Sequence, residues 1–454
     1  MGMRNITAPI GSYLPRLVEA LRQQLRDPDF RTRHRVRPQD FTRHRALPFA
    51  LVILFILQKT VKSVQRHLNE FLAQVAPELP DAGATPGGWT QARAKLKHTA
   101  FGELNQLCVL PAVYQDDQAP PPRRWHGHRL LAIDSSLLRL PNSQDIAQAF
   151  GRVIVSNQTG ATGTEYPQAR VWVLYDVLNR IGLDPRLEPS TVGEIDLAIE
   201  QLPHFQEHDV AVMDRGFAGY RLLAYFLQAK RDFIVRCSTG SFLAAQELFR
   251  LNRAGRSKEV RLFAPADQKA ALLTLGLPLE IVVRFVSLRL PTGELEVLAT
   301  SLLNEESYPT QEFKAVYHCR WGIETYYGDR KGRLDLENFS GLTAEAIRQD
   351  FHAAVLLCNL ESVLTGPASQ ALSDHRPKCQ YPQQVNRANS FHALKMHAWE
   401  LLSSERPAEG VVRRLQRLFL SNPVSVRKDR KAPRPKLSFP RSYHFQRRVK
   451  KIVF

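Results

Sequence analysis

The sequence predicts a protein of mixed α/β class, with an all-helical segment before the α/β part and a basic tail after it. Three patterns support this fold class. Residues 14–72 carry apolar side chains at helical spacing, residues 129–236 alternate short apolar strands with helices, and residues 411–454 carry fourteen Lys and Arg against Asp429 alone. A chain of 454 residues with 44% hydrophobic and 23% charged residues is long enough for about two to four globular domains.

The first 115 residues are predicted to form a helical DNA-binding domain. Leucines recur at 14, 17, 21 and 25, and the apolar run 49–57 (FALVILFIL) is too short to span a bilayer. A later helix begins near Trp89, and its Arg93, Lys95 and Lys97 are candidates for phosphate contacts. The alternative is a helical bundle that only packs against the next domain.

Residues 125–365 are predicted to form the α/β domain, after the Pro-rich linker 115–124. Asp134 and Asp214 each follow a short apolar run, and open α/β sheets place their sites at the carboxyl ends of strands. Asp176 is either a fourth acid or the partner of a basic side chain. Residues 237–308 are predicted to contain strands only, which makes them a β-rich insertion.

The net charge of +18 is concentrated at the two ends of the chain. Residues 1–48 carry ten Arg and four acids (+6), residues 411–454 carry +13, and 18 − 6 − 13 leaves −1 for the middle. A neutral body with basic ends is typical of nucleic-acid binding, although solvated tails are an alternative. The five scattered cysteines and the absence of a signal-peptide pattern indicate a reducing, cytoplasmic location without a membrane partner.

One stretch brings unusual chemistry to a single helix face. In a helix over residues 316–331, four side chains fall within an arc about 60° wide: Tyr317, Arg320, Glu324 and Lys331. An acid flanked by two cations and a phenol suits a metal-binding carboxylate whose neighbours hold phosphates. A helix with ordinary salt bridges at i,i+4 is the alternative.

The pattern Tyr317-x2-Arg320-x3-Glu324-x6-Lys331 resembles the Y-R-E-K signature of DDE transposases of the insertion sequence four family. Ile133-Asp134-Ser-Ser and Asp214-Arg215-Gly-Phe-x2-Tyr resemble the family's two aspartate motifs. The resemblance implies a ribonuclease H-like catalytic domain with a β-rich insertion. It also implies that Asp134, Asp214 and Glu324 hold two Mg²⁺ or Mn²⁺ ions, and that Tyr317, Arg320, Lys331 and Arg215 contact DNA.

The implied function is that of a bacterial DNA transposase, which cuts element ends and joins them to target DNA as a dimer or higher oligomer. Residues 366–454 would supply a helical and basic region that contacts DNA or a partner. The alternatives are a transposase-derived DNA-binding protein without catalysis and a ribonuclease H-like nuclease without strand transfer. Some family members stack a flipped base on a Trp in the insertion. This chain has none between 237 and 308, so Phe285 or another aromatic residue would have to substitute.

Overall fold

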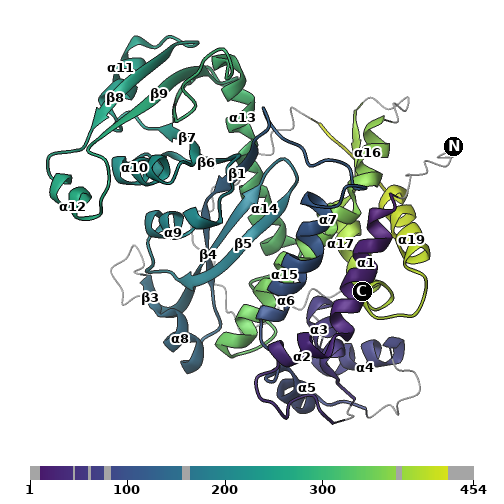
Figure 1. The fold of residues 1–454 in the computed structure, drawn as a ribbon. Coiled ribbons are helices and arrows are strands. Elements are labelled where there is room, and N and C mark those ends of the chain that lie inside the picture. Colours follow the sequence, from purple (N-terminus) through teal and green to yellow (C-terminus); the bar gives the residue numbers. More distant parts are fainter. Residues whose placement is uncertain are drawn as a thin grey trace. The chain divides into compact units, whose positions relative to one another are not determined.

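The computed structural model describes residues 11–43, 46–59, 63–75, 83–155, 164–374 and 381–427. Figure 1 shows the helices and strands of the chain. Contacts divide the chain into two units, each assembled from separate segments. The first unit comprises Met1–Pro122, Arg139–Gln168 and Arg330–Phe454, and the second comprises Arg123–Leu138 and Ala169–Asp329. Two of the crossings between units fall inside strand β4 (Thr164–Asp176) and helix α14 (Trp321–Gly332).

The first unit is mainly helical. Its N-terminal helices are α1 (Tyr13–Arg26), α2 (Pro28–His34), α3 (Phe49–Leu57), α4 (Val64–Val75), α5 (Pro86–Arg93), α6 (Thr99–Leu104) and α7 (Leu110–Tyr114), with a π-helical turn at Asn105–Val109. Its other elements are α8 (Gln144–Phe150), β3 (Arg152–Val155), α15 (Ala344–Leu364), α16 (Gly366–Asp374), β11 (Gln383–Gln384), α17 (Arg387–Met396), α18 (Ala398–Leu402), α19 (Ala408–Ser421) and β12 (Val424–Ser425).

The prediction of a helical N-terminal region is confirmed. All four leucines of the α1 pattern are buried, and α3 is buried along almost its whole length. A helix that is apolar on all sides needs neighbours around it, and both α3 and α6 pack against the long helix α15. Helix α1 packs against α19, so the two ends of the chain share one helical core.

The second unit is built on the mixed sheet. Its elements are β1 (Arg129–Ile133), β2 (Ser135–Arg139), β5 (Ile181–Pro189), α9 (Glu194–Glu200), β6 (Asp209–Met213), α10 (Tyr220–Gln228), β7 (Asp232–Cys237), α11 (Leu243–Leu251), β8 (Ser257–Phe263), α12 (Lys269–Thr274), β9 (Glu280–Arg289), β10 (Leu295–Thr300), α13 (Phe313–Cys319) and the main part of α14. The strand order is β2-β4-β1-β6-β7-β10-β9-β8, and β3 and β5 also pair with β4. Strands β1, β6 and β7 are parallel neighbours, whereas the pairs β1–β4, β7–β10, β10–β9 and β9–β8 are antiparallel. The α/β prediction is therefore confirmed at the level of a large mixed sheet.

The segment 237–308 contains the expected antiparallel strands β8, β9 and β10, but the prediction of strands alone was wrong. Helices α11 and α12 also lie in it. Ala244, Ala245 and Leu248 of α11 are buried at helical spacing, and Asn252 ends the helix in a left-handed conformation. This short helical period is masked in the sequence by the longer apolar strands around it.

The predicted boundaries 1–115, 125–365 and 366–454 follow the order of the chain, whereas packing groups residues 330–365 with the N-terminal helices. As functional domains these three segments stay a prediction. The basic residues 428–454 lie outside the described residues. In the described part of the chain, no helix combines the length and the apolar character needed to cross a membrane.

Candidate active site

Asp134 and Asp214 emerge side by side from the parallel centre of the sheet. Strand β1 ends at Ile133 and β6 at Met213, and these two residues are partners in the parallel register. Neighbouring strands lie roughly 4.8 Å apart, so the aspartates that follow leave the sheet next to each other. The Asp214 carboxylate also accepts a hydrogen bond from the Gly216 N–H (2.8 Å) and caps the short turn that carries Arg215.

The Asp134 carboxyl group is shielded from solvent, with 24% of the side chain exposed. Its pKa is raised to about 6, chiefly because burial disfavours the charged form. The nearby charges of Asp214 and Glu194 act in the same direction, whereas the Ser135 N–H and Arg320 favour the carboxylate. A cation close to Asp134 would therefore stabilise its charged form.

Glu324 comes to this region on helix α14, and Arg320 joins it to Asp134. An Arg320 guanidinium nitrogen donates to Glu324 Oε1 at 3.0 Å, and another lies 3.7 Å from Asp134 Oδ2. The sequence predicts one helix here, but the structure has two, because Arg320 forms a tight turn between α13 and α14 with its N–H bonded to the Tyr317 carbonyl (3.0 Å). The turn keeps helical dihedral angles, so Arg320 and Glu324 still meet at i,i+4 spacing.

Tyr317 is buried rather than exposed on the helix surface. Only 3% of the residue is accessible, and its ring belongs to a core with Phe313 and Val316. Burial raises the pKa of its phenol, and its hydroxyl finds no hydrogen-bond partner among the described residues. A buried hydroxyl without a partner is uncommon, and such groups are often found at functional sites.

Two more of the predicted DNA contacts, Arg215 and Lys331, have surface access. Arg215 is exposed directly after Asp214. Helix α14 continues beyond Gly328 to Gly332, so the half-exposed Lys331 lies in its last turn, as the sequence pattern requires. Both side chains remain candidates for contact with a polyanion.

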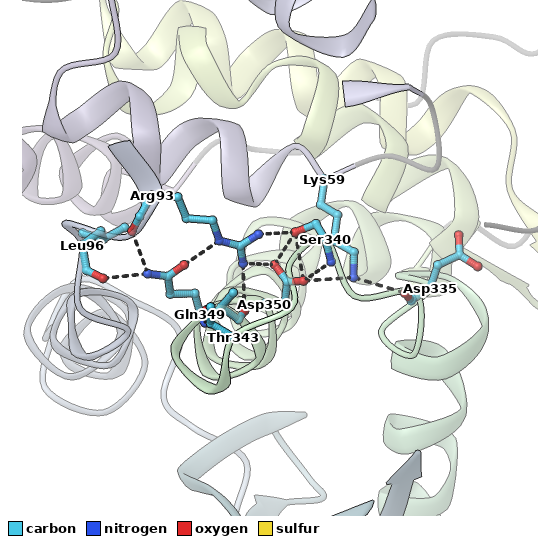
Figure 2. Close-up of polar contacts among 9 residues, drawn as sticks. Lys59, Arg93, Leu96, Asp335, Ser340, Thr343, Gln349 and Asp350 are labelled. Atoms are coloured by element: carbon cyan, nitrogen blue, oxygen red, sulfur yellow. Dashed lines mark hydrogen bonds and ion pairs between the residues drawn. The ribbon is translucent and has the colours of Figure 1, made fainter. Parts of the chain in front are cut away.

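Arg93 has a different environment from the one expected of a phosphate contact. Its guanidinium donates to three residues of α15: Gln349 (2.7 Å), Asp350 (2.7 Å) and the Ala346 carbonyl (2.8 Å). Figure 2 shows the contacts with Gln349 and Asp350. The residue is 4% exposed, and Lys59 lies 3.7 Å from the same Asp350. All its donors point into the protein, so Arg93 is a packing residue in this structure.

Lys95 and Lys97, the other two candidates from this segment, are half-buried. Lys97 Nζ donates to the Arg33 carbonyl (3.2 Å). Lys95 lines a hollow of about 580 Å³ together with Arg43, Gln39 and Thr85. Of the three candidates, Lys95 and Lys97 keep a charged group that a phosphate could approach, whereas the guanidinium of Arg93 is enclosed.

Two residues that are distant in the sequence, Arg170 and Glu194, contact Ser135 beside the strand ends and were not predicted. Ser135 donates to Glu194, and Arg170 donates to both Ser135 (2.7 Å) and Glu194 (2.6 Å). Glu194 begins α9 and Arg170 lies in β4, so 59 and 35 residues separate them from Ser135. No local pattern predicts such a network, because the sheet brings its members together.

The chemistry of the acids fits a divalent metal, although they are not gathered into a closed metal cage. Carboxylate oxygens are the ligands that Mg²⁺ and Mn²⁺ prefer. Among the described residues, no group of three or more His, Cys, Asp or Glu side chains is close enough to hold an ion. Arg320 supplies the positive charge between Asp134 and Glu324 instead.

Two other expectations concern single side chains of the sheet. Phe285 is completely buried in β9 and packs edge-on against Phe242, so its ring is not available to stack on a base. Asp176 is also buried, and its carboxylate accepts hydrogen bonds from the N–H groups of Leu178 and Asn179 at the β4–β5 turn. Asp176 thus stabilises a turn.

A sheet that places two aspartates at adjacent strand ends, with a glutamate on a following helix, is the arrangement expected of a metal-dependent phosphoryl-transfer enzyme. The family model described as "Transposase DDE domain" matches residues 125–360, a range that includes all three acids. The chain belongs to this transposase family.

Two individual proteins are also similar to this chain. The transposase InsG for insertion sequence element IS4 of Escherichia coli (strain K12) is 22% identical over 366 residues, which are 79% of this chain and 76% of that protein. Among solved structures, the cryo-EM structure of the piggyBac transposase synaptic complex with hairpin DNA aligns with a TM-score of 0.45 and 13% identity. It covers 90% of this chain and 85% of that one.

Proposed function

We propose that this protein is a DNA transposase that cuts the ends of an insertion element and joins them to target DNA. The observation that carries the proposal is the pairing of Ile133 with Met213 in adjacent parallel strands, after which Asp134 and Asp214 leave the sheet as neighbours. Arg320 contacts both Asp134 and Glu324. Membership of the DDE transposase domain family supports the same activity. The sheet would be the ribonuclease H-like core of the catalytic domain.

Asp134, Asp214 and Glu324 are the proposed ligands of two Mg²⁺ or Mn²⁺ ions. Ions held there would activate a water for phosphodiester hydrolysis and stabilise the leaving oxygen. Arg320, Arg215 and Lys331 would bind the phosphates on either side of the cut, and the buried Tyr317 would support Arg320 from beneath, its ring centroid 5.7 Å from the guanidinium carbon.

The substrates would be the element ends and the target DNA. The family relationship and the basic charge of the chain support this proposal. Cutting two ends together would call for at least two copies of this chain. The protein would act on DNA in the bacterial cytoplasm, and its similarity to an Escherichia coli transposase supports a bacterial setting.

The decisive experiment is cleavage of a supercoiled plasmid that carries the gene with its native flanks, in Mg²⁺. Wild-type protein should cut at the element ends and give joined products. Glu324→Gln should lose more than about a hundredfold of this activity, because losing even a neighbour of a metal ligand costs 10- to 100-fold. The matched control is Glu280→Gln, an exposed acid on β9 paired with Arg261, which should cut like wild type.

The other outcomes distinguish the alternatives. Equal cutting by wild type and Glu324→Gln would contradict the assignment of the site. Binding to the flanks without any cutting would favour a transposase-derived DNA-binding protein. Nicks without joined products would favour a nuclease that lacks strand transfer.

A further inference from the structure

Arg320 is the cation nearest to two of the proposed metal ligands. Its guanidinium lies 3.0 Å from Glu324 Oε1 and 3.7 Å from Asp134 Oδ2, with only 7% of the side chain exposed. In this position one arginine partly neutralises two carboxylates from elements that are nearly two hundred residues apart in the chain.

The carboxylate oxygens of Asp134 and Glu324 cannot pair closely with Arg320 and coordinate a divalent ion at the same time. A metal ion would have to approach Asp134 and Glu324 against the positive charge of the guanidinium, and it would need the oxygen to which Arg320 now donates. Metal binding therefore requires Arg320 to move, and anything that holds Arg320 elsewhere will favour the metal.

Arg320 is placed so that it can move. It occupies the tight turn between α13 and α14, and its Nε has no hydrogen-bond partner among the described residues. Its guanidinium carbon also lies 5.0 Å from the ring centroid of Trp321, a residue that is 45% exposed. The exposed indole gives the cation a favourable surface on the way to solvent.

We propose that Arg320 is an internal counter-ion that keeps the carboxylates from binding metal until a DNA phosphate attracts the guanidinium away. DNA and divalent metal then bind cooperatively, because each favours the arrangement in which Arg320 has left Asp134 and Glu324. Linkage requires the effect to be reciprocal, so metal also raises the affinity for DNA by the same factor. This proposal rests on the proposed function, since it takes the three acids as the metal site.

The test measures Mn²⁺ binding to the full-length protein by titration calorimetry, without DNA and with a duplex from the native flank of the gene. Without DNA, Arg320→Gln should bind Mn²⁺ roughly tenfold more tightly than wild type, within the 5- to 150-fold range usual for coupled sites. The duplex should raise the Mn²⁺ affinity of wild type by a similar factor and leave that of Arg320→Gln almost unchanged.

Two further variants make the result specific. Arg221→Gln removes one positive charge from an exposed arginine of α10 that pairs with Asp196, and it should bind Mn²⁺ like wild type. Arg320→Lys keeps the charge but loses the fork that reaches both acids, so it should give an intermediate affinity. The lysine variant also keeps the test valid if Arg320→Gln folds poorly.

Failure of this inference can be told apart from failure of the proposed function. If Asp134→Asn abolishes Mn²⁺ binding but wild type, Arg320→Lys and Arg320→Gln all bind Mn²⁺ equally, the metal site stands and the counter-ion role is overturned. If Asp134→Asn binds Mn²⁺ as well as wild type does, the metal site itself is wrong and both proposals fail.

Discussion

Arg320 and Arg93 are both buried arginines, and their neighbours give them opposite properties. Arg93 is surrounded by fixed acceptors and pairs with Asp350, an acid whose side chain is completely buried. Arg320 instead faces two carboxylates that are 24% and 39% exposed and keeps one donor without a partner in the described structure. A fully satisfied buried pair stabilises packing, whereas a partly satisfied one can exchange its partners.

At this scale we predict that Arg93→Ala lowers the free energy of unfolding by about 3–5 kcal/mol, because it leaves the buried Asp350 carboxylate without its main partner. The measurement is urea denaturation followed by circular dichroism. Arg66→Ala is the matched control, because Arg66 is 72% exposed and pairs with Glu70 on one helix face. It should cost only about 0.5 kcal/mol. Equal losses for the two variants would show that the Arg93 pair is not a buried stabilising contact.

Helix α14 is the element that sets the position of Glu324. It packs closely on the sheet, with Tyr326 stacked on Tyr175 of β4 (4.3 Å between ring centroids). Gly182 of β5 permits this approach, because a Cβ added there would lie 2.0 Å from the Tyr326 hydroxyl and 2.9 Å from its Cζ. A side chain at position 182 would therefore push helix α14 away at Tyr326, which lies two positions after Glu324.

We predict that Gly182→Ala destabilises the protein by about 1–3 kcal/mol, the usual cost of overpacking, and reduces plasmid cutting. The double variant Gly182→Ala with Tyr326→Phe should recover part of both losses, because the closest clashing atom is gone. Gly328→Ala, on the same helix with nothing within 4 Å of the added Cβ, should instead be neutral or slightly stabilising. Thermal unfolding measures the stability of each variant. If the stability losses of Gly182→Ala and Tyr326→Phe simply add in the double variant, the packing explanation is wrong.

The elements of the site could be predicted much better than its contacts. Apolar runs that end in an acid are sufficient to place Asp134 and Asp214 at strand ends, and helical spacing places Arg320 and Glu324 together. The burial of Arg93 could not be predicted, since its partner Asp350 is 257 residues away. The same holds for the contacts of Ser135 with Arg170 and Glu194, which depend on strand register rather than on local sequence.

Over the whole molecule, stability should depend on pH through the first unit. Burial lowers the pKa of His352 on α15 to about 3, and its ring stacks on that of His98 (5.1 Å between centroids). Unfolded histidine titrates near 6.5, so between pH 6.5 and 3 the unfolded chain binds a proton that the folded chain does not. This contribution to stability is complete above pH 6.5 and is lost progressively as the pH falls towards 3.

We predict that His352→Gln flattens this part of the profile. The melting temperature of wild type should fall more between pH 7.5 and pH 5 than that of the variant, even if the variant is less stable at pH 7.5. Differential scanning fluorimetry in matched buffers measures both. Parallel curves for the two proteins would mean that His352 does not contribute to the acid sensitivity.

The helical unit formed by both ends of the chain has a consequence for synthesis. Helix α3 is apolar on all sides and is covered by α15, which lies almost three hundred residues later. During translation the ribosome adds about 5–20 residues per second, so the face of α3 that packs on α15 waits many seconds for its partner. Over that time the nascent chain exposes a strongly apolar segment, and a chaperone that shields such segments is expected to favour productive folding.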